Sequence, residues 1–265
     1  MARTKLDTEA TGWSSIGDHS ARSSAGVSAA EDIARRIQDL IVAEGLEEGD
    51  RVPSERDIAQ LLSTSRPTVS QAIRILVTRG LVESRRGSGS YVTNRPLASF
   101  ENSVSLMLDL NSDSVGQLHE LRLWLEMTGV LTAIERASDE DLAVGEEALT
   151  RLVGDAGDTA AWMSSDTRFH ATLVRASNNP YLASIYESVH AALINYEYRA
   201  WIENGSVPEW LEPQNADALV RLHEPILNAL KARDAEAARQ AVQAHHEAMA
   251  DHIAQSSVAR GDVSQ

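Results

Sequence analysis

Apolar residues in the first third of the chain recur at the spacing of α-helices. Ile33, Ile37 and Ile41 lie one helical turn apart and so form a single stripe. Two more helices are predicted to begin after Ser54 and Ser65, because a serine at such a position can accept a hydrogen bond from the first turn. The helix that follows Ser65 turns four apolar residues inward: Val69, Ala72, Ile73 and Leu76.

Two short strands are predicted after these helices. Residues 81–84 and 91–93 carry apolar and β-branched side chains, and the loop between them, 85–90, holds two arginines and two glycines. Three helices followed by a basic hairpin are the layout of a winged helix-turn-helix. In that motif one helix enters the major groove of DNA, and we expect the arginines of the hairpin to contact phosphate.

The rest of the chain is helical in pattern up to about residue 254. Turn-forming residues interrupt this pattern repeatedly, which predicts six or seven helices in an antiparallel bundle. The breaks are residues 111–113, 138–139, 154–157, 178–180, 205–213 and 233–234. The expected fold is therefore mainly α, with four parts: a disordered tail (1–26), a winged helix-turn-helix domain (27–96), an all-α helical domain (97–256) and a second tail (257–265).

The distribution of charge separates the two predicted domains. A net charge of −15 would argue against a nucleic-acid binder if it were spread evenly. However, residues 51–96 hold eight arginines against only Glu55, Asp57 and Glu83, and the negative excess lies in residues 97–265. This asymmetry indicates that the N-terminal domain is the part that meets DNA.

Composition excludes several classes of protein. The chain contains no cysteine, which excludes disulfides, thiol catalysis and cysteine-based zinc fingers. It contains neither a run of about eighteen apolar residues nor the apolar stretch of a signal peptide. We therefore expect a cytoplasmic protein that has no membrane partner.

Four residues of the helical domain have the spacing of metal ligands. Asp166 and His170 are four residues apart, so both project from one face of a helix. His223 and His245 lie on either side of the break at 233–234, so an antiparallel pair of helices brings them to the same height. Imidazole and carboxylate ligands suit a divalent ion, with zinc as the first choice and nickel, iron or manganese as alternatives.

The other histidines are weaker candidates for this site. His252 lies on the same helix face as His245 and is a rival ligand. His246 points about 100° away from its neighbour His245 and is left out of the predicted site. The remaining three are expected to be structural or solvated: His19, His119 and His190.

Several motifs, in the same order, resemble one known family. The N-terminal domain of the GntR family of bacterial transcription regulators is similar to residues 49–56 (GDRVPSER), 65–69 (SRPTV), 80–83 (GLVE) and 87–92 (GSGSYV). The helical domain resembles the FCD ligand-binding domain of the FadR-type branch of that family. The motifs that carry this second resemblance are ELR at 120–122 with Glu126, DTRFH at 166–170, ASNNP at 176–180, and the paired His223 and His245.

The resemblance implies a function as well as a fold. It implies a dimeric repressor that binds operator DNA, holds a divalent metal on the four candidate ligands, and responds to a small carboxylate metabolite. It also places Arg122 inside the bundle, where the partner of the guanidinium is either Glu126 or the carboxylate of that metabolite. Asn179 and Tyr198 are further candidates for hydrogen bonds to the effector.

The DNA contacts are predicted on three elements: the start of the helix after Ser54, the helix after Ser65 (the recognition helix) and the basic hairpin (the wing). Arg56 and Arg66 are expected to contact phosphate or guanine. The other candidates are Ser65, Thr68, Ser70 and Gln71 on the recognition helix, and Arg85, Arg86 and Gly89 in the wing. The alternative is that some of these arginines only solvate a helix face or pair with Glu55 or Asp57.

Two departures from the family and two other functions remain open. Ser70 stands where the family commonly has arginine, so the family's usual operator is not assumed, and Pro225 lies either in a first helical turn or at a kink. One alternative function is a metal-dependent enzyme with the winged domain as adaptor, and the other is a metal sensor. The chain has no HExxH, GxSxG or glycine-rich phosphate loop, so we expect a regulator rather than an enzyme.

Overall fold

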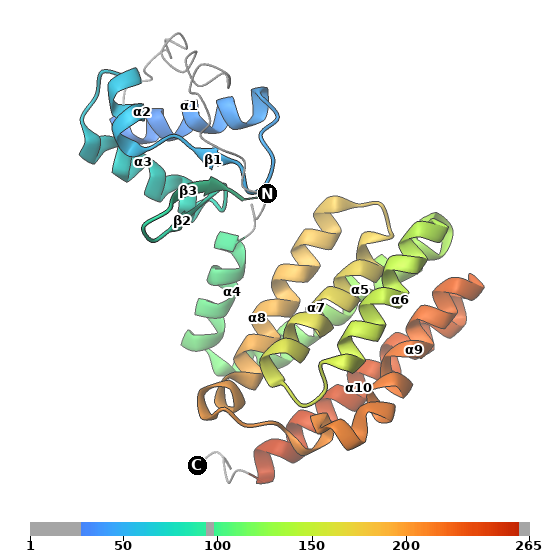
Figure 1. Ribbon diagram of the computed structural model, residues 1–265. Coiled ribbons are helices and arrows are strands. Elements are labelled where there is room, and N and C mark those ends of the chain that lie inside the picture. The colour runs from blue at the N-terminus through green and yellow to red at the C-terminus, as the bar shows by residue number, and fades with distance from the viewer. Residues whose placement is uncertain (1–27, 94–97, 260–265) are drawn as a thin grey trace. The chain divides into compact units, whose positions relative to one another are not determined.

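The computed structural model of the chain describes residues 28–93 and 98–259. The tail predicted for residues 1–26 lies outside the described residues. The chain divides into two compact units, Met1–Ser99 and Phe100–Gln265, which Figure 1 shows in ribbon form. Each unit contains a hydrophobic core of its own.

The N-terminal unit consists of three helices and a small antiparallel sheet. The helices are α1 (Ala29–Ala43), α2 (Glu55–Leu61) and α3 (Arg66–Thr78), and the strands are β1 (Arg51–Val52), β2 (Val82–Arg85) and β3 (Gly89–Val92), in the order β1-β3-β2. This layout confirms the predicted winged helix-turn-helix. The two strands of the hairpin lie within two residues of their predicted positions. β1 is absent from the sequence prediction, because two residues are too few to show an alternating pattern.

Serine caps begin all three of these helices. Ser28, Ser54 and Ser65 each accept a hydrogen bond from the backbone N–H three residues further on. Pro67 lies in the first turn of α3, where a missing N–H removes no intrahelical hydrogen bond. The predicted inward residues of α3 are all buried against the apolar stripe of α1: Val69, Ala72, Ile73 and Leu76.

Seven α-helices form the described part of the C-terminal unit. They are α4 (Ala98–Leu110), α5 (Val115–Arg136), α6 (Asp139–Gly154), α7 (Thr159–Arg175), α8 (Pro180–Asn204), α9 (Ala216–Ala232) and α10 (Ala235–Ala259). Short 3-10 turns precede α5 and α9: η2 (Ser112–Ser114), η3 (Glu209–Leu211) and η4 (Pro213–Asn215). Every break predicted from the sequence separates two of these helices. The tail predicted from residue 257 begins inside α10, which continues to Ala259.

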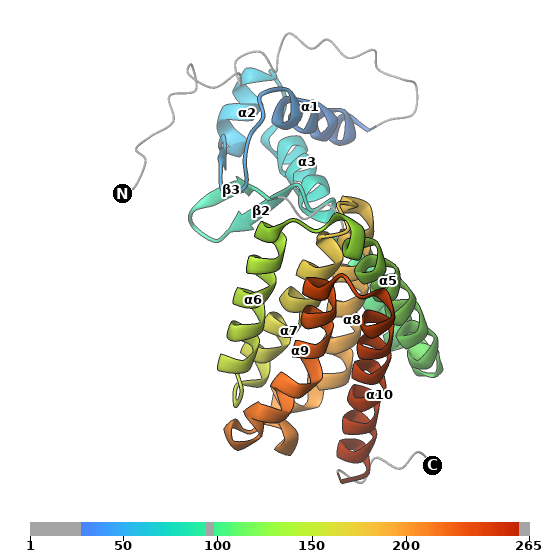
Figure 2. The same ribbon diagram turned by 90° about the vertical axis from the view of Figure 1, so that its right-hand side faces the viewer.

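The helices of this unit pack as a bundle in which α5 and α7 lie against each other. α7 contacts α5, α6 and α8, while α9 lies between α6 and α10, and α10 also contacts α5. Figure 2 shows α6, α9 and α10 side by side. Gly129 permits the close approach of α5 to α7, because a Cβ at that position would lie 2.6 Å from Cγ1 of Val174. Pro225 lies inside α9, not in its first turn. Among the described residues, no helix is both long enough and apolar enough to cross a membrane.

Candidate metal centre and DNA-binding surface

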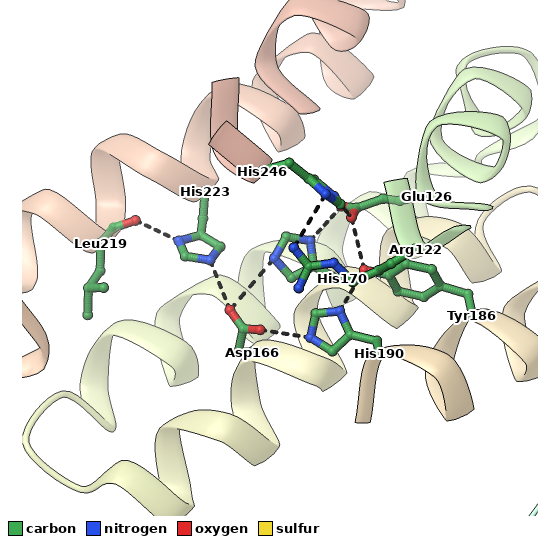
Figure 3. A network of polar contacts seen from close by, with 9 residues as sticks. All are labelled: Arg122, Glu126, Asp166, His170, Tyr186, His190, Leu219, His223 and His246. Carbon is green, nitrogen blue, oxygen red and sulfur yellow. Dashed lines mark hydrogen bonds and ion pairs between the residues drawn. The ribbon is translucent and has the colours of Figure 1, made fainter. Parts of the chain in front are cut away.

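Three of the predicted metal ligands converge inside the helical bundle. His170 of α7, His223 of α9 and His245 of α10 each offer a ligand atom, and these atoms all lie within 4.8 Å of one another. All three side chains are buried. Oδ1 of Asp166 lies 3.1 Å from Nε2 of His223 and 3.7 Å from Nε2 of His170 (Figure 3). Three imidazoles and one carboxylate therefore meet at one place, drawn from three helices.

Hydrogen bonds fix the outer nitrogens of two of these histidines as donors. Nδ1 of His223 is 2.8 Å from the carbonyl oxygen of Leu219, which only accepts, so Nδ1 carries a proton. Nε2 of the same ring lies 3.1 Å from Oδ1 of Asp166, and if this nitrogen carries no proton, its lone pair faces an acceptor. Nδ1 of His170 likewise donates to Glu126 over 2.6 Å, and its Nε2 has no hydrogen-bond partner among the described residues. Lone pairs that face one another in a buried site require a cation between them, either a proton or a metal ion.

These residues fit a divalent metal ion by their chemistry. Within the described ranges, Nδ1 of His245 also lacks a hydrogen-bond partner, although this atom is buried. Unpaired imidazole nitrogens beside a carboxylate are a donor set that zinc, nickel, iron or manganese accepts.

A buried carboxylate orients the histidines from behind. Glu126 of α5 accepts hydrogen bonds from Nδ1 of His170 (2.6 Å), Nε2 of His246 (2.7 Å) and the hydroxyl of Tyr186 (2.9 Å). A carboxylate in this position fixes the tautomer and ring orientation of a metal-binding histidine and raises its basicity. Glu126 therefore supports the candidate ligand His170 and is not itself in the group of converging ligand atoms.

Asp166 receives similar support from α8. Nε2 of His190 lies 2.9 Å from Oδ2 of Asp166, and Nδ1 of His190 lies 2.9 Å from the hydroxyl of Tyr186. The contacts thus run from Asp166 through His190 and Tyr186 to Glu126, as Figure 3 shows. Both buried carboxylates belong to one network.

Burial and charge act against each other on the pKa values of this network. Burial alone would raise the pKa of Glu126 and of Asp166, but the charges and hydrogen bonds of the surrounding histidines hold both well below their usual range. Burial lowers the pKa of His245 far below its ordinary value and that of His190 to about 4. Burial opposes protonation of His170 too, yet the charges of Glu126 and Asp166 outweigh it and raise the pKa of that ring. The site therefore holds two ionised carboxylates that attract a cation.

Arg122 of α5 brings a buried guanidinium to the same site. The residue is 2% exposed, and within the described parts of the chain its hydrogen bond is from Nη2 to Nδ1 of His246, over 3.3 Å. Its Nε has no hydrogen-bond partner among these residues. Of the two predicted partners, Glu126 is not used: it forms no ion pair with Arg122 and bonds His170, His246 and Tyr186 instead. A buried guanidinium whose Nε has no partner among the described residues is suited to receive the carboxylate of a ligand.

The remaining residues singled out in this domain lie in different settings. Tyr198 is buried, its ring centroid is 5.6 Å from that of Trp162, and its hydroxyl has no hydrogen-bond partner in the part of the chain that the structure describes. Asn179 is the exposed N-cap of α8, and its side-chain oxygen accepts from the backbone three residues on, so its hydrogen bonds are those of a helix cap. His252 stacks on Trp210 and is not among the three converging histidines. His19 lies outside the described residues.

The predicted DNA-reading residues lie at the start of α3. Ser65 accepts from the backbone N–H of Thr68, and the two hydroxyls are 2.6 Å apart, so both belong to the helix cap. Ser70 is half-buried, and Gln71 is exposed. The exposed edge of the recognition helix therefore offers polar side chains together with Arg66.

Arg56 and Arg66, at the N-terminal ends of α2 and α3, differ in whether they form an ion pair. Nε of Arg66 lies 3.2 Å from Glu55, which is the alternative contact that the sequence allowed. The side chain of Arg66 is 73% exposed, and an ion pair in such a setting is weak enough to exchange for phosphate. Arg56 is exposed and forms no ion pair within the described residues.

The wing presents one arginine that is paired and one that is not. Nε of Arg85 lies 2.7 Å from Glu83, and its guanidinium carbon lies 4.4 Å from the ring centroid of Tyr91. Arg86, in the tight loop between β2 and β3, is exposed and makes no ion pair with a described residue. Gly89 has a φ of +116°, a value that side chains rarely permit.

Comparison with known proteins decides the family. The family model described as "FCD domain" matches residues 117–254, and the model "Bacterial regulatory proteins, gntR family" matches residues 29–92. The chain belongs to the GntR family and carries a C-terminal FCD domain. The matched ranges are the two domains whose motifs carried the resemblance.

The relatives of this GntR protein are transcriptional regulators, not enzymes. The HTH-type transcriptional repressor NanR of Salmonella newport is 28% identical over 221 residues, which cover 81% of each chain. NanR of Salmonella typhimurium is also 28% identical, over 81% of this chain and 80% of its own. The solved structure of Streptococcus agalactiae GntR has a TM-score of 0.60 and 25% identity, and covers 83% of this chain and 98% of that one.

Sequence reasoning missed part of the network around the candidate ligands. His246 was excluded because it lies about 100° from His245 on the helix. α10 contacts both α5 and α9, so one histidine turns to His223 of α9 and the other to Glu126 of α5. A helix that buries two faces can bring two adjacent residues into contact with two different neighbouring helices.

Proposed function

We propose that this GntR regulator is a repressor whose affinity for operator DNA is controlled by a small carboxylate bound in the FCD domain. The observation that carries the proposal is the buried Arg122, which has no carboxylate partner in the described parts of the chain and lies in the same network as the three converging histidines. The repressor assignment is supported by the names of the Salmonella relatives.

A divalent ion would be held by Asp166, His170, His223 and His245. Zinc is the first choice, and nickel, iron and manganese are alternatives. When bound, the ion supplies a Lewis-acidic centre with coordination positions for ligand oxygens. Arg122 supplies a second anchor, because two parallel N–H groups of a guanidinium match the two oxygens of a carboxylate. Tyr198 is a candidate hydrogen-bonding group for the rest of the effector.

The N-terminal domain would bind double-stranded DNA through the recognition helix and wing. Arg56, Arg66 and Arg86 would meet phosphate or guanine, and their exposure supports this role. The remaining candidates are Ser65, Thr68, Ser70 and Gln71 on the helix, and Arg85 and Gly89 in the wing. The chain would do this in the cytoplasm.

We further propose that the regulator is a homodimer. Two copies place two recognition helices on successive major-groove faces of a pseudo-palindromic operator. Support comes from apolar side chains on the outside of α5 and α8, where Trp124 is 62% exposed and Tyr181 is 80% exposed. The effector would act by favouring one conformation of this dimer over another.

The test is a DNA-binding titration, with the metal content of the protein measured on the same sample. Fluorescence anisotropy would follow the full chain on a duplex selected from a random pool, against a scrambled duplex, at about 0.15 M salt. We expect one member of a panel of small organic acids to weaken binding by the wild type and to have little effect on Arg122→Gln, while both retain metal through dialysis. The absence of specific DNA binding at low salt would overturn the regulator, and an equal response of both proteins would overturn the effector site. An ion lost on dialysis that itself changes DNA affinity would indicate a metal sensor instead.

A further inference from the structure

The strand register sorts the residues of the small sheet onto two faces. Arg51 of β1 pairs with Tyr91 of β3, which pairs with Glu83 of β2, and Gly89 pairs with Arg85. Neighbours in register point the same way, so these five residues share one face. The alternate residues Val52, Val82 and Val92 are buried, which leaves the face of Arg51 outward.

Arg51 differs from Arg85, the arginine predicted for this wing. Arg85 is held by Glu83, with Nε at 2.7 Å and Nη2 at 2.5 Å from the same carboxylate oxygen. Arg51 is exposed and has no ion pair with any described residue. The positive charge on this face that no carboxylate offsets is therefore that of Arg51.

The backbone of the wing leaves room for the Arg51 guanidinium. A Cβ on Gly89 would lie 3.3 Å from Nε and 3.4 Å from Nη2 of Arg51. The guanidinium thus lies against the backbone of β3 at the base of the wing loop. A planar, multiply donating group held there can bind a phosphate oxygen beside the loop that carries Arg86.

We propose that Arg51 is a phosphate-binding residue of the wing, and that it contributes more to DNA affinity than the neutralised Arg85. The proposal rests on DNA binding by the N-terminal domain. Because phosphate contacts carry no sequence information, Arg51 acts equally on specific and scrambled duplexes.

The experiment compares Arg51→Gln with Arg35→Gln in the full chain. Arg35 is a matched control, since it lies in the same domain, is similarly solvent-facing and pairs with Asp32 at 2.9 Å. Each Arg51 that meets phosphate should add about 0.9 to the slope of log K against log salt. In each subunit that contacts DNA, loss of the Arg51–phosphate contact therefore weakens binding about fifteenfold at about 0.05 M salt and about fivefold at about 0.15 M salt. Arg35→Gln should change DNA affinity by less than about twofold and should keep the wild-type slope of log K against log salt.

Three further measurements separate the possible outcomes. Melting temperatures show whether Arg51→Gln is folded, and Arg51→Lys, which keeps the charge, should recover part of the affinity and the salt slope. Arg85→Gln should lose less affinity than Arg51→Gln. Equal slopes for Arg51→Gln and Arg35→Gln, with both proteins folded, would overturn the proposal. Failure of the wild type to bind any duplex would instead refute the proposed function itself.

Discussion

Replacement of Glu126 by glutamine tests whether the buried network serves a metal. Glu126 accepts from His170, His246 and Tyr186 at 2.6, 2.7 and 2.9 Å. A glutamine has one accepting oxygen and one donating nitrogen, so it cannot accept from all three. If its amide donates to Nδ1 of His170, the ring proton moves to Nε2 and blocks the nitrogen that faces the candidate site. We therefore expect Glu126→Gln to weaken metal binding although the residue is not a ligand.

The loss of metal affinity should appear as a smaller stabilisation by metal, because binding to the folded state stabilises it. Loss of an outer partner of a metal-binding histidine typically costs about 10- to 100-fold in affinity. At a free metal concentration about 1,000 times the wild-type Kd, the metal stabilises the wild type by about 4 kcal/mol. The same concentration would stabilise Glu126→Gln by about 1.4 to 2.7 kcal/mol. The metal-dependent rise in melting temperature should fall to between about one third and two thirds of its wild-type value.

The assay is thermal unfolding of each protein with a chelator and with zinc. The chelated sample measures the destabilisation caused by the substitution alone, so the difference between the two curves reports metal binding. Glu197→Gln is the matched control, because Glu197 is also a buried carboxylate hydrogen-bonded to a histidine, with Oε1 at 2.5 Å from Nε2 of His119. Glu197→Gln should keep the full metal-dependent shift. If Glu126→Gln kept it as well, the orienting role of Glu126 would be refuted.

Three other predictions follow from the described contacts. Ser65→Ala removes the N-cap of α3, and should destabilise the N-terminal domain by about 1 kcal/mol in urea unfolding. Gly129→Ala overpacks α5 against α7, and should cost about 1–3 kcal/mol by the same measurement, whereas Gly116→Ala, where a Cβ meets nothing within 4 Å, should be tolerated. Neighbouring carboxylates outweigh burial and raise the pKa of His170, so protons should compete with metal there at a higher pH than at a free histidine. As the pH is lowered, zinc affinity in a chelator competition should begin to fall above about 6.5, the pKa of a free histidine, and an affinity independent of pH between about 5 and 8 would contradict His170 as a ligand.

The sequence predicted those parts of the molecule in which one residue decides one local feature. Ser54 and Ser65 begin helices because a side-chain oxygen can satisfy the first turn, whatever else surrounds it. The spacing of Asp166 and His170 likewise places them on one face. By contrast, β1 depends on partners in β3 that lie some forty residues away, and no local pattern reports them.

The roles of Glu126 and Arg122 depend on competition that a sequence does not show. The two residues are four apart on α5, a spacing at which opposite charges on an isolated helix attract. In the folded domain, three donors from α7, α8 and α10 occupy the carboxylate of Glu126. Only these tertiary contacts show that Glu126 is bonded to other residues and does not pair with Arg122.

This arrangement gives the sign of the coupling between metal and effector. The charge of Arg122 opposes protonation of both His170 and His190, although burial and the neighbouring carboxylates act on these rings more strongly. A metal ion in the candidate metal site would be repelled by the same charge, and an effector carboxylate between the two cations would relieve the repulsion. By linkage, the acid must raise metal affinity by the same factor by which the metal raises affinity for the acid. Without acid, Arg122→Gln should bind zinc more tightly than the wild type, and the acid should then add little. Zinc competition with and without the acid measures both quantities, and an acid that regulates DNA binding but leaves zinc affinity unchanged would show that the two do not share this site.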